Sequence, residues 1–147
     1  MTTSLFVALT VAAAALMAAA VIGVLLERRS GALREVTPPA EDAAASVEPD
    51  TSDLGLSRTG PTVVHFSAVW CGPCAAVRRV VNQVCRDLSG VAHVEIDMDA
   101  NPAAARRLSV LSLPTTFIFD AEGHQRYRAA GVPRAADLRA ALQPLLA

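Results

Sequence analysis

Two cysteines separated by two residues are the strongest candidates for chemistry in this sequence. Cys71 and Cys74 follow an apolar run, Thr62–Ser67, that is typical of a buried strand, and they open a segment in which apolar residues have helical spacing. The free N–H groups and the positive dipole end of a helix stabilise an anion, so a thiol at this junction has a lowered pKa and is partly ionised near neutral pH. We therefore expect Cys71 to be a nucleophile, with Cys74 one helical turn further on and within its reach.

The composition favours redox chemistry over the binding of nucleic acid or of a metal. The 147 residues carry 13 basic side chains, all of them Arg, and 14 acidic ones, so the net charge of -1 gives no electrostatic attraction for nucleic acid. The sequence has three cysteines, and none of them has the spacing of a zinc finger. One Cys-X-X-Cys pair supplies two soft ligands for Cu(I) or Zn, whereas Zn prefers four. A metal carrier is therefore the weaker alternative, and neither a metal nor another cofactor is expected.

The first stretch of the chain is apolar enough to predict a membrane anchor, residues 1–29. Residues 4–26 carry no charged side chain and, at about 1.5 Å per helical residue, are long enough to cross a hydrocarbon layer of roughly 30 Å. A cleaved signal peptide is the alternative, favoured by Ala18–Ala20 but opposed by the absence of a basic residue in Met1–Thr3. We therefore predict a single-pass transmembrane helix that binds membrane lipid.

The basic residues beside this stretch predict the side of the membrane on which the rest of the chain lies. Arg28, Arg29 and Arg34 follow the apolar stretch and nothing basic precedes it, so the positive-inside rule places the C-terminal part in the cytoplasm. The extracytoplasmic orientation stays open as an alternative. Residues 30–58 are rich in Pro, Ala and acidic side chains and lack aliphatic periodicity, which indicates a flexible linker.

Residues 59–147 have the pattern of one α/β domain. Largely apolar segments predict three strands, at residues 62–67, 91–97 and 115–120, and the turn at residues 121–124 predicts a fourth strand at 125–130 that pairs back on the third. Helical spacing predicts three helices, at residues 71–88, at 101–108 with Asn101 as N-cap, and from Pro133 onward. The first two strands are separated by a helix and should be parallel with a right-handed crossover, whereas the last two form a hairpin. The predicted fold is therefore a central mixed sheet flanked by helices.

Several short motifs of this domain resemble the thioredoxin family. The Trp-Cys-Gly-Pro-Cys sequence of residues 70–74 follows a buried strand, Leu113-Pro114-Thr115 precedes the third strand, Gly131 follows the fourth, and an amphipathic helix closes the chain. The resemblance covers about residues 59–147 and implies a thioredoxin-like fold. The family usually opens with an additional strand and helix, and in this sequence we expect that element to be degraded or absent.

The resemblance also implies a reaction and assigns residues to it. Cys71 would attack a disulfide of a protein substrate, and Cys74 would then attack Cys71, releasing the reduced substrate and leaving a Cys71–Cys74 disulfide. A separate electron donor, such as a thioredoxin reductase or a membrane dithiol carrier, would regenerate the dithiol. The resemblance gives the flanking residues supporting roles. Trp70 covers one side of the site, and Gly72 and Pro73 keep the turn tight and favour a reducing protein. The substrate is bound by Leu113, a cis-Pro114 and Gly131.

Two residues beneath the predicted site depart from the family. Where the family usually has a buried Asp on the first core strand and a Lys on its neighbour, this sequence has His65 and Glu95, so acid and base are exchanged between the strands. Our hypothesis is that His65 and Glu95 relay the proton of Cys74, because His has an ordinary pKa of about 6.5 that burial or a carboxylate shifts. The alternative is a buried, hydrogen-bonded His without a catalytic part. Cys85 lies on the apolar stripe of the first helix of this domain and is interpreted as a packed core thiol.

The sequence thus predicts a membrane-anchored thiol–disulfide oxidoreductase, a protein-disulfide reductase of the thioredoxin type. An extracytoplasmic thiol oxidase, or a reductase of the kind that serves cytochrome maturation, is the alternative within the same chemistry. A metal carrier that uses the same two thiols is the alternative from a different class.

Overall fold

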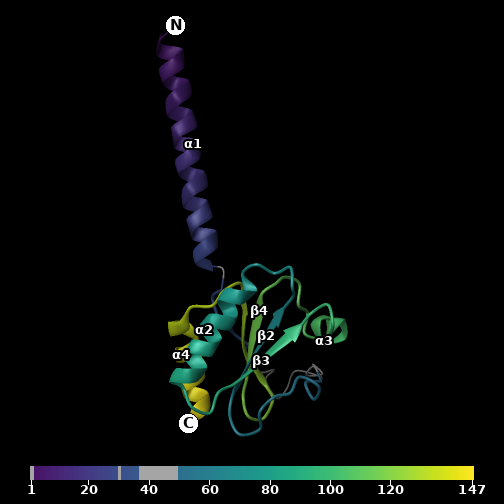
Figure 1. The fold of residues 1–147 in the computed structure, drawn as a ribbon. Coiled ribbons are helices and arrows are strands. Elements are labelled where there is room, and N and C mark those ends of the chain that lie inside the picture. The colour runs from purple at the N-terminus through teal and green to yellow at the C-terminus, as the bar shows by residue number, and fades with distance from the viewer. Residues whose placement is uncertain (1, 30, 37–49) are drawn as a thin grey trace, which may run out of the picture. The chain divides into compact units, whose positions relative to one another are not determined.

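The chain folds into two compact units, Met1–Ser30 and Gly31–Ala147. The computed structural model describes residues 2–29, 31–36 and 50–147. In the first unit one long helix, α1 (Thr2–Arg29), contains the apolar stretch 4–26 (Figure 1). The described residues include no helix that is both long enough and apolar enough to span a membrane. The helix is thus confirmed, and the membrane span stays a prediction from the sequence.

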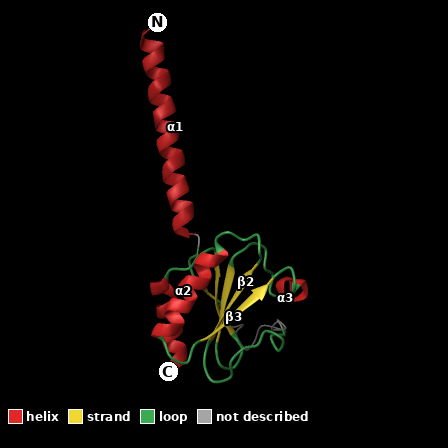
Figure 2. Ribbon diagram, in the orientation of Figure 1, coloured by secondary structure: helices red, strands yellow, loops and turns green. Residues whose placement is uncertain are grey.

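The second unit is built around a mixed sheet that has five strands in the described residues (Figures 1 and 2). In the order in which they lie side by side, the strands are β1 (Arg34–Glu35), β5 (Gln125–Ala130), β4 (Thr115–Phe119), β2 (Thr62–Ser67) and β3 (Ala92–Asp97). β2 and β3 are parallel, whereas β2 with β4, β4 with β5 and β1 with β5 are antiparallel. The predicted mixed sheet, with its parallel pair and its hairpin, is confirmed.

Helices cover both faces of this sheet. They are α2 (Cys74–Asp87), α3 (Pro102–Arg107), α4 (Ala135–Leu142) and the short 3-10 helix η1 (Gln143–Leu146). α2 and α4 pack on one face, and α3 packs on the other (Figure 1). Successive side chains of a strand point to opposite faces, so Val63 of β2 packs on the α2 side and Val64 on the α3 side. The sheet therefore separates two apolar cores.

Large apolar side chains fill both cores and fix the sheet. On the α3 side the largest fully buried side chains are aromatic: Phe66, Phe117 and Phe119. On the other side the predicted apolar stripe of α2 faces the core: Val77, Val81 and Val84 are fully buried, and Val80, Cys85 and Leu88 are partly buried. Full burial of a Val or Phe side chain contributes about 1.5–3 kcal/mol relative to exposure. The packing of α2 on the sheet thus holds the beginning of this helix close to the end of β2.

The predicted flexible linker, residues 30–58, differs from the structure at both of its described ends. β1 pairs with β5 through Arg34 opposite Arg128, and Leu54 is 3% exposed within the core on the α3 side. The middle of the predicted linker, residues 37–49, lies outside the described residues. The compact unit therefore begins at Gly31. The sequence did not indicate this, because a two-residue strand and a single Leu produce no periodic pattern.

α2 begins three residues later than predicted. The N–H of Cys74 donates to the carbonyl oxygen of Cys71 at 3.3 Å as part of a turn, and the N–H of Val77 donates to that of Pro73, also at 3.3 Å, at the start of the helix. Pro73 stands at the N-cap, where its missing N–H costs no helical hydrogen bond. Cys71 consequently lies in the turn before α2, and Cys74 is the first residue of the helix.

Candidate active site

The candidate active site is centred on a disulfide between Cys71 and Cys74. The sulfur atoms are 1.98 Å apart and the two Cα atoms 5.5 Å apart. Cys71 is partly exposed, whereas Cys74 is only 2% exposed. The Cys74 sulfur lies 3.9 Å from the carbonyl oxygen of Phe66, near the end of β2. An incoming sulfur atom can therefore reach Cys71 but not Cys74.

Exposed residues flank this disulfide. Trp70 is 63% exposed, and its indole Nε1 donates a hydrogen bond to Oδ2 of Asp99 at 2.9 Å. Val69 is 94% exposed, and Gly72 and Pro73 are exposed as well. The sequence analysis did not identify Asp99. Its position could have indicated this contact. Asp99 follows β3 as Trp70 follows β2, and the carboxyl ends of these two parallel strands lie at the same edge of the sheet.

The peptide bond between Leu113 and Pro114 is cis, as the resemblance implies. β4 begins at Thr115, directly opposite Phe66 of β2, so this bond lies at the same end of the sheet as the disulfide. The N–H of Gly131 donates to the carbonyl oxygen of Pro114 at 2.8 Å, and Gly131 has a φ of 91°, which favours glycine. The structure thus brings the predicted substrate-binding residues Pro114 and Gly131 together.

His65 and Glu95 are neighbours, as the relay hypothesis requires, but they are not directly hydrogen-bonded. They lie opposite each other on β2 and β3, with Nε2 of His65 3.6 Å from Oε1 of Glu95. The hydrogen bond of the His65 ring goes instead to His93, with Nδ1 of His65 2.9 Å from Nε2 of His93. His65 is fully buried, and burial lowers its pKa from 6.5 to about 4. At neutral pH this ring is therefore uncharged.

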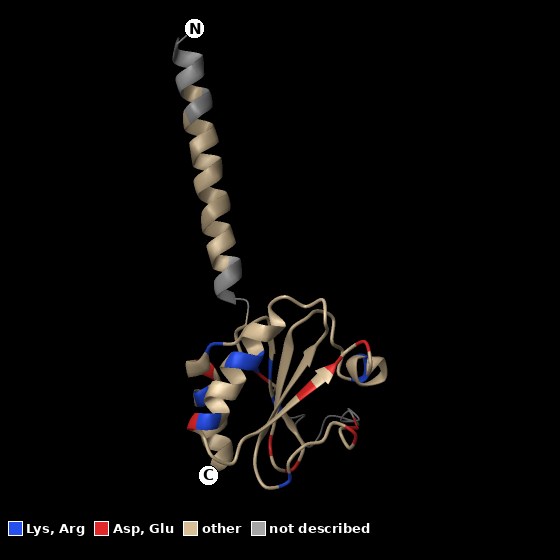
Figure 3. Ribbon diagram, viewed as in Figure 1, with Lys and Arg blue, Asp and Glu red and all other residues tan. Residues whose placement is uncertain are grey.

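Glu95 is held as a carboxylate by its other partners. Nε of Arg78 donates to Oε2 at 2.6 Å, a second Arg78 nitrogen donates to Oε1, and the Ser67 hydroxyl donates to Oε1 at 2.8 Å. Chiefly the hydrogen bond from Arg78 lowers the pKa of Glu95 to about 2. Figure 3 shows basic positions on α2 and acidic positions on β3, the two elements that this ion pair joins. Glu95 thus acts as a fixed negative charge near His65 and is not a proton carrier at neutral pH.

A second histidine, which the sequence analysis left without a functional role, continues this polar group toward the surface. Nδ1 of His93 is 2.9 Å from Oδ1 of Asn82 on α2, and the His93 ring stacks on His65 with the ring centres 5.0 Å apart. Burial also lowers the pKa of His93. The signal for His93 was its spacing of two residues from Glu95, which places both side chains on the same face of β3.

The third cysteine takes the structural part that the sequence predicts. Cys85 is a free thiol, partly buried, and packs against the core beneath α2 and α4. Burial raises the pKa of this thiol, so it stays protonated and unreactive near neutral pH.

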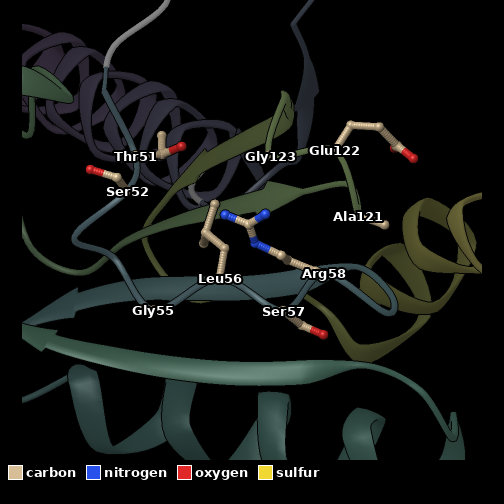
Figure 4. Close-up of a pocket in the computed structure, with 9 residues that line it drawn as sticks. All are labelled: Thr51, Ser52, Gly55, Leu56, Ser57, Arg58, Ala121, Glu122 and Gly123. Carbon is tan, nitrogen blue, oxygen red and sulfur yellow. The ribbon is translucent and has the colours of Figure 1, made fainter.

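One hollow in the surface contains none of the predicted site residues. It has a volume of about 460 Å³ and is lined by residues of the 51–58 segment and by the turn 121–123, with Arg58 lying across it (Figure 4). The turn follows β4 at the end of the sheet opposite to Pro114. Among the residues that the structure describes, no group of three or more His, Cys, Asp or Glu side chains is placed to hold a metal ion.

These observations define the class of site. A partly exposed Cys71 is bonded to a buried Cys74 at the beginning of a helix, where the helix dipole stabilises a thiolate once the disulfide is opened. A cis-proline and a glycine lie at the same end of the sheet. This arrangement is that of a thiol–disulfide redox protein.

Comparisons with known proteins identify the family. The family model described as Thioredoxin matches residues 46–144. A thioredoxin of Mycolicibacterium smegmatis is 41% identical over 86 residues, which cover 54% of this chain and 75% of that protein. A thioredoxin of Staphylococcus saprophyticus is 36% identical over 63 residues, which cover 42% of this chain and 61% of that protein.

Solved structures agree with this result. Chloroplastic thioredoxin z is 32% identical, with a TM-score of 0.55 over 60% of this chain and 80% of that one. Thioredoxin from Trypanosoma brucei brucei is 30% identical, with a TM-score of 0.54 over 62% of this chain and 79% of that one. The chain therefore belongs to the thioredoxin family, and its Cys71–Cys74 pair makes it a protein thiol–disulfide oxidoreductase.

Proposed function

We propose that this protein reduces disulfides of partner proteins at a membrane surface, to which residues 4–26 anchor it. The observation that carries the redox part is the pairing of a partly exposed Cys71 with a buried Cys74 at the beginning of α2. The exposed Val69 and Trp70 and the cis-Pro114 provide an apolar and a backbone surface for an extended substrate segment.

The reaction consists of two thiol–disulfide exchanges. The Cys71 thiolate attacks one sulfur of the substrate disulfide, forms a mixed disulfide and releases the other substrate sulfur as a thiolate. Cys74 loses its proton, attacks the Cys71 sulfur and releases the second substrate thiolate, so that the substrate gains two electrons and the enzyme is left as its Cys71–Cys74 disulfide. A thioredoxin reductase or a membrane dithiol carrier would supply two electrons to restore the dithiol.

In this proposal His65 is the group that takes the proton of Cys74. It lies on β2 immediately before Phe66, whose carbonyl oxygen is near the Cys74 sulfur. Its Nε2 is buried, has no hydrogen-bond partner among the described residues and lies 3.6 Å from Oε1 of Glu95; with the ring proton on Nδ1, this nitrogen can accept a proton. Glu95 stabilises the transient positive charge on the ring but keeps no proton itself, because its pKa is about 2. The relay thus differs from the original hypothesis, in which His65 and Glu95 shared the proton.

We expect the full chain to accelerate the reduction of insulin disulfides by dithiothreitol. Each turnover exposes Cys71 as a thiolate, which attacks disulfides faster than dithiothreitol does near neutral pH. The measurement is the turbidity that the freed insulin B chain produces over time, with the Cys71→Ser variant as matched control. A wild-type rate equal to that of the variant would contradict the proposed reductase. A measured potential far more oxidising than that of thioredoxins, about -270 mV, would instead favour the oxidase alternative.

Anchoring to a membrane rests on the uncharged stretch 4–26, and the cytoplasmic side rests on Arg28, Arg29 and Arg34. We expect the full chain to stay in the membrane fraction after an alkaline carbonate wash, and a chain without residues 2–29 to be released. An alkaline phosphatase fused to the C-terminus should be inactive, because this reporter works only outside the cytoplasm. A full chain found in the soluble fraction contradicts the anchor, and an active reporter contradicts the orientation.

A further inference from the structure

Polar residues on one side of α2 form hydrogen bonds with polar residues of β3 at regular intervals. Arg78 binds Glu95, and Asn82, four residues further along α2, binds His93, two residues back along β3. Four helical residues advance about 6 Å and two strand residues about 6.6 Å, so the two rows stay in step. Cys74 is four residues before Arg78 and therefore opens the same row of the helix.

Within these rows the side chains form a continuous chain of hydrogen bonds from solvent to the interior. Asn82 is exposed, His93 is partly buried and His65 is fully buried. Both links of the chain are 2.9 Å long, from Asn82 to His93 and from His93 to His65. At its inner end, within the part of the chain that the structure describes, Nε2 of His65 has no hydrogen-bond partner.

The hydrogen-bond pattern assigns the protons along this chain. Oδ1 of Asn82 accepts a hydrogen bond, so Nδ1 of His93 carries the proton and its Nε2 is an acceptor. With this tautomer of His93, Nδ1 of His65 donates to His93, and Nε2 of His65, which lies 3.6 Å from Oε1 of Glu95, carries no proton. A neutral histidine with this tautomer is ready to take a proton at the buried nitrogen and to give one up at the other.

We propose that His93 and Asn82 form the outer half of a proton route that connects His65 to solvent between α2 and β3. This inference rests on the proposed function, in which His65 takes the proton of Cys74. His93 carries the proton onward, and Asn82 is a positioning residue that holds the His93 ring in place through its hydrogen bond to Nδ1.

The thiol proton of Cys74 moves to Nε2 of His65, the Nδ1 proton of His65 moves to Nε2 of His93, and the Nδ1 proton of His93 leaves to water. The electron pair stays on the Cys74 sulfur, which forms the bond to Cys71 as the bond between Cys71 and the substrate sulfur breaks. When an electron donor later reduces the disulfide, the same chain returns a proton to Cys74. The Asn82 carboxamide accepts from or donates to His93 according to its rotation, so it serves both proton patterns.

The surroundings of His65 explain why a proton that it accepts must be passed on to another group. His65 is faced by Glu95 and His93 from β3, by Arg78 from α2 and by the uncharged Thr116 from β4. Burial makes a positive charge on His65 unfavourable and thereby lowers its pKa to about 4. A proton that arrives at Nε2 is therefore passed on to His93, which is closer to water. The route needs neutral histidines, so its rate falls when the pH is lowered through their pKa values.

The experiment follows the reaction of the reduced full chain with Ellman's reagent, 5,5′-dithiobis(2-nitrobenzoate), in a Cys85→Ala background. Attack by Cys71 releases the first coloured thiolate, and attack by Cys74 on the mixed disulfide releases the second. His93→Gln keeps the hydrogen-bonding capacity but carries no proton. We expect it to slow the second release by about tenfold at pH 7, less than the roughly 10²-fold that a group transferring the proton directly contributes. The first release should be unchanged, and Asn82→Ala should give a smaller decrease.

A chemical rescue separates proton transfer from a structural role. His93→Gly opens space for exogenous imidazole, which should restore the second release in this variant and leave the wild type unchanged. His124→Gln, in the turn at the other end of the sheet, is the matched control and should behave as the wild type does.

A second release at the wild-type rate in His93→Gln would overturn the route, and so would a slow His93→Gly that imidazole does not accelerate. A normal second release in His65→Leu would overturn the role of His65 and the route with it. A wild-type chain that releases no thiolate from the reagent would overturn the proposed function itself.

Discussion

Replacing Cys74 with Ser is expected to leave a protein that captures its substrates through Cys71 and cannot release them. Cys71 is the more exposed of the two cysteines and still forms the mixed disulfide, but a hydroxyl in place of the buried thiol cannot attack it. Steady-state turnover in the insulin assay should fall by at least about 10³-fold, as it does when a residue of a catalytic unit is removed. The covalent adduct should be visible on non-reducing gels and should disappear when dithiothreitol is added.

The other two cysteines provide the controls for this experiment. Cys71→Ser should lose both turnover and capture, because the remaining thiol of Cys74 is 2% exposed. Cys85→Ser should keep turnover, since this thiol packs beside the core and takes no part in the exchange. Capture by Cys71→Ser, with none by Cys74→Ser, would show that the roles of the two cysteines are reversed.

The sequence was sufficient to place the site on the fold. The strand before the motif is a mostly apolar run, and the stripe that starts at Val77 has helical spacing, so the position of Cys71 and Cys74 between a strand and a helix followed directly. The cis bond before Pro114 followed only from the resemblance to a family, because local sequence favours the trans form of nearly every X-Pro bond.

The contacts between α2 and β3 could not be predicted in the same way. Whether Asn82 meets His93, and Arg78 meets Glu95, depends on how the helix is rotated and inclined on the sheet, which the packing of the whole core decides. The same holds for Asn101: it stands at the N-cap of α3 as predicted, but its side chain donates to the carbonyl oxygen of Asp97 and does not cap the helix. Polar side chains have several partners within reach, and only the tertiary structure selects one.

The stability of the second unit is expected to fall in two steps as the pH is lowered. His65 has a pKa of about 4 in the folded protein and an ordinary value of 6.5, so between these values the unfolded chain binds more protons than the folded one. The free energy of unfolding should therefore decrease from pH 6.5 to pH 4, by about 3 kcal/mol. His93, whose pKa is also lowered, adds to this loss. Glu95 contributes below that range, because its pKa is about 2 in the folded protein and 4.5 ordinarily, and its contribution is lost as the pH falls from 4.5 to 2.

Urea unfolding of the full chain at several pH values measures this dependence. Trp70 is the only tryptophan in the sequence, so its fluorescence reports the unit that contains the site and not α1. His65→Leu should weaken the dependence between pH 6.5 and pH 4, leaving the part due to His93, and Glu95→Gln should remove the dependence that Glu95 contributes below pH 4.5. His124→Gln should leave both steps in place. If the free energy of unfolding of the wild type stayed constant from pH 7 to pH 4, the folded protein would tolerate a charged His65. Such a histidine would keep the proton of Cys74 and would not need His93 to carry it away.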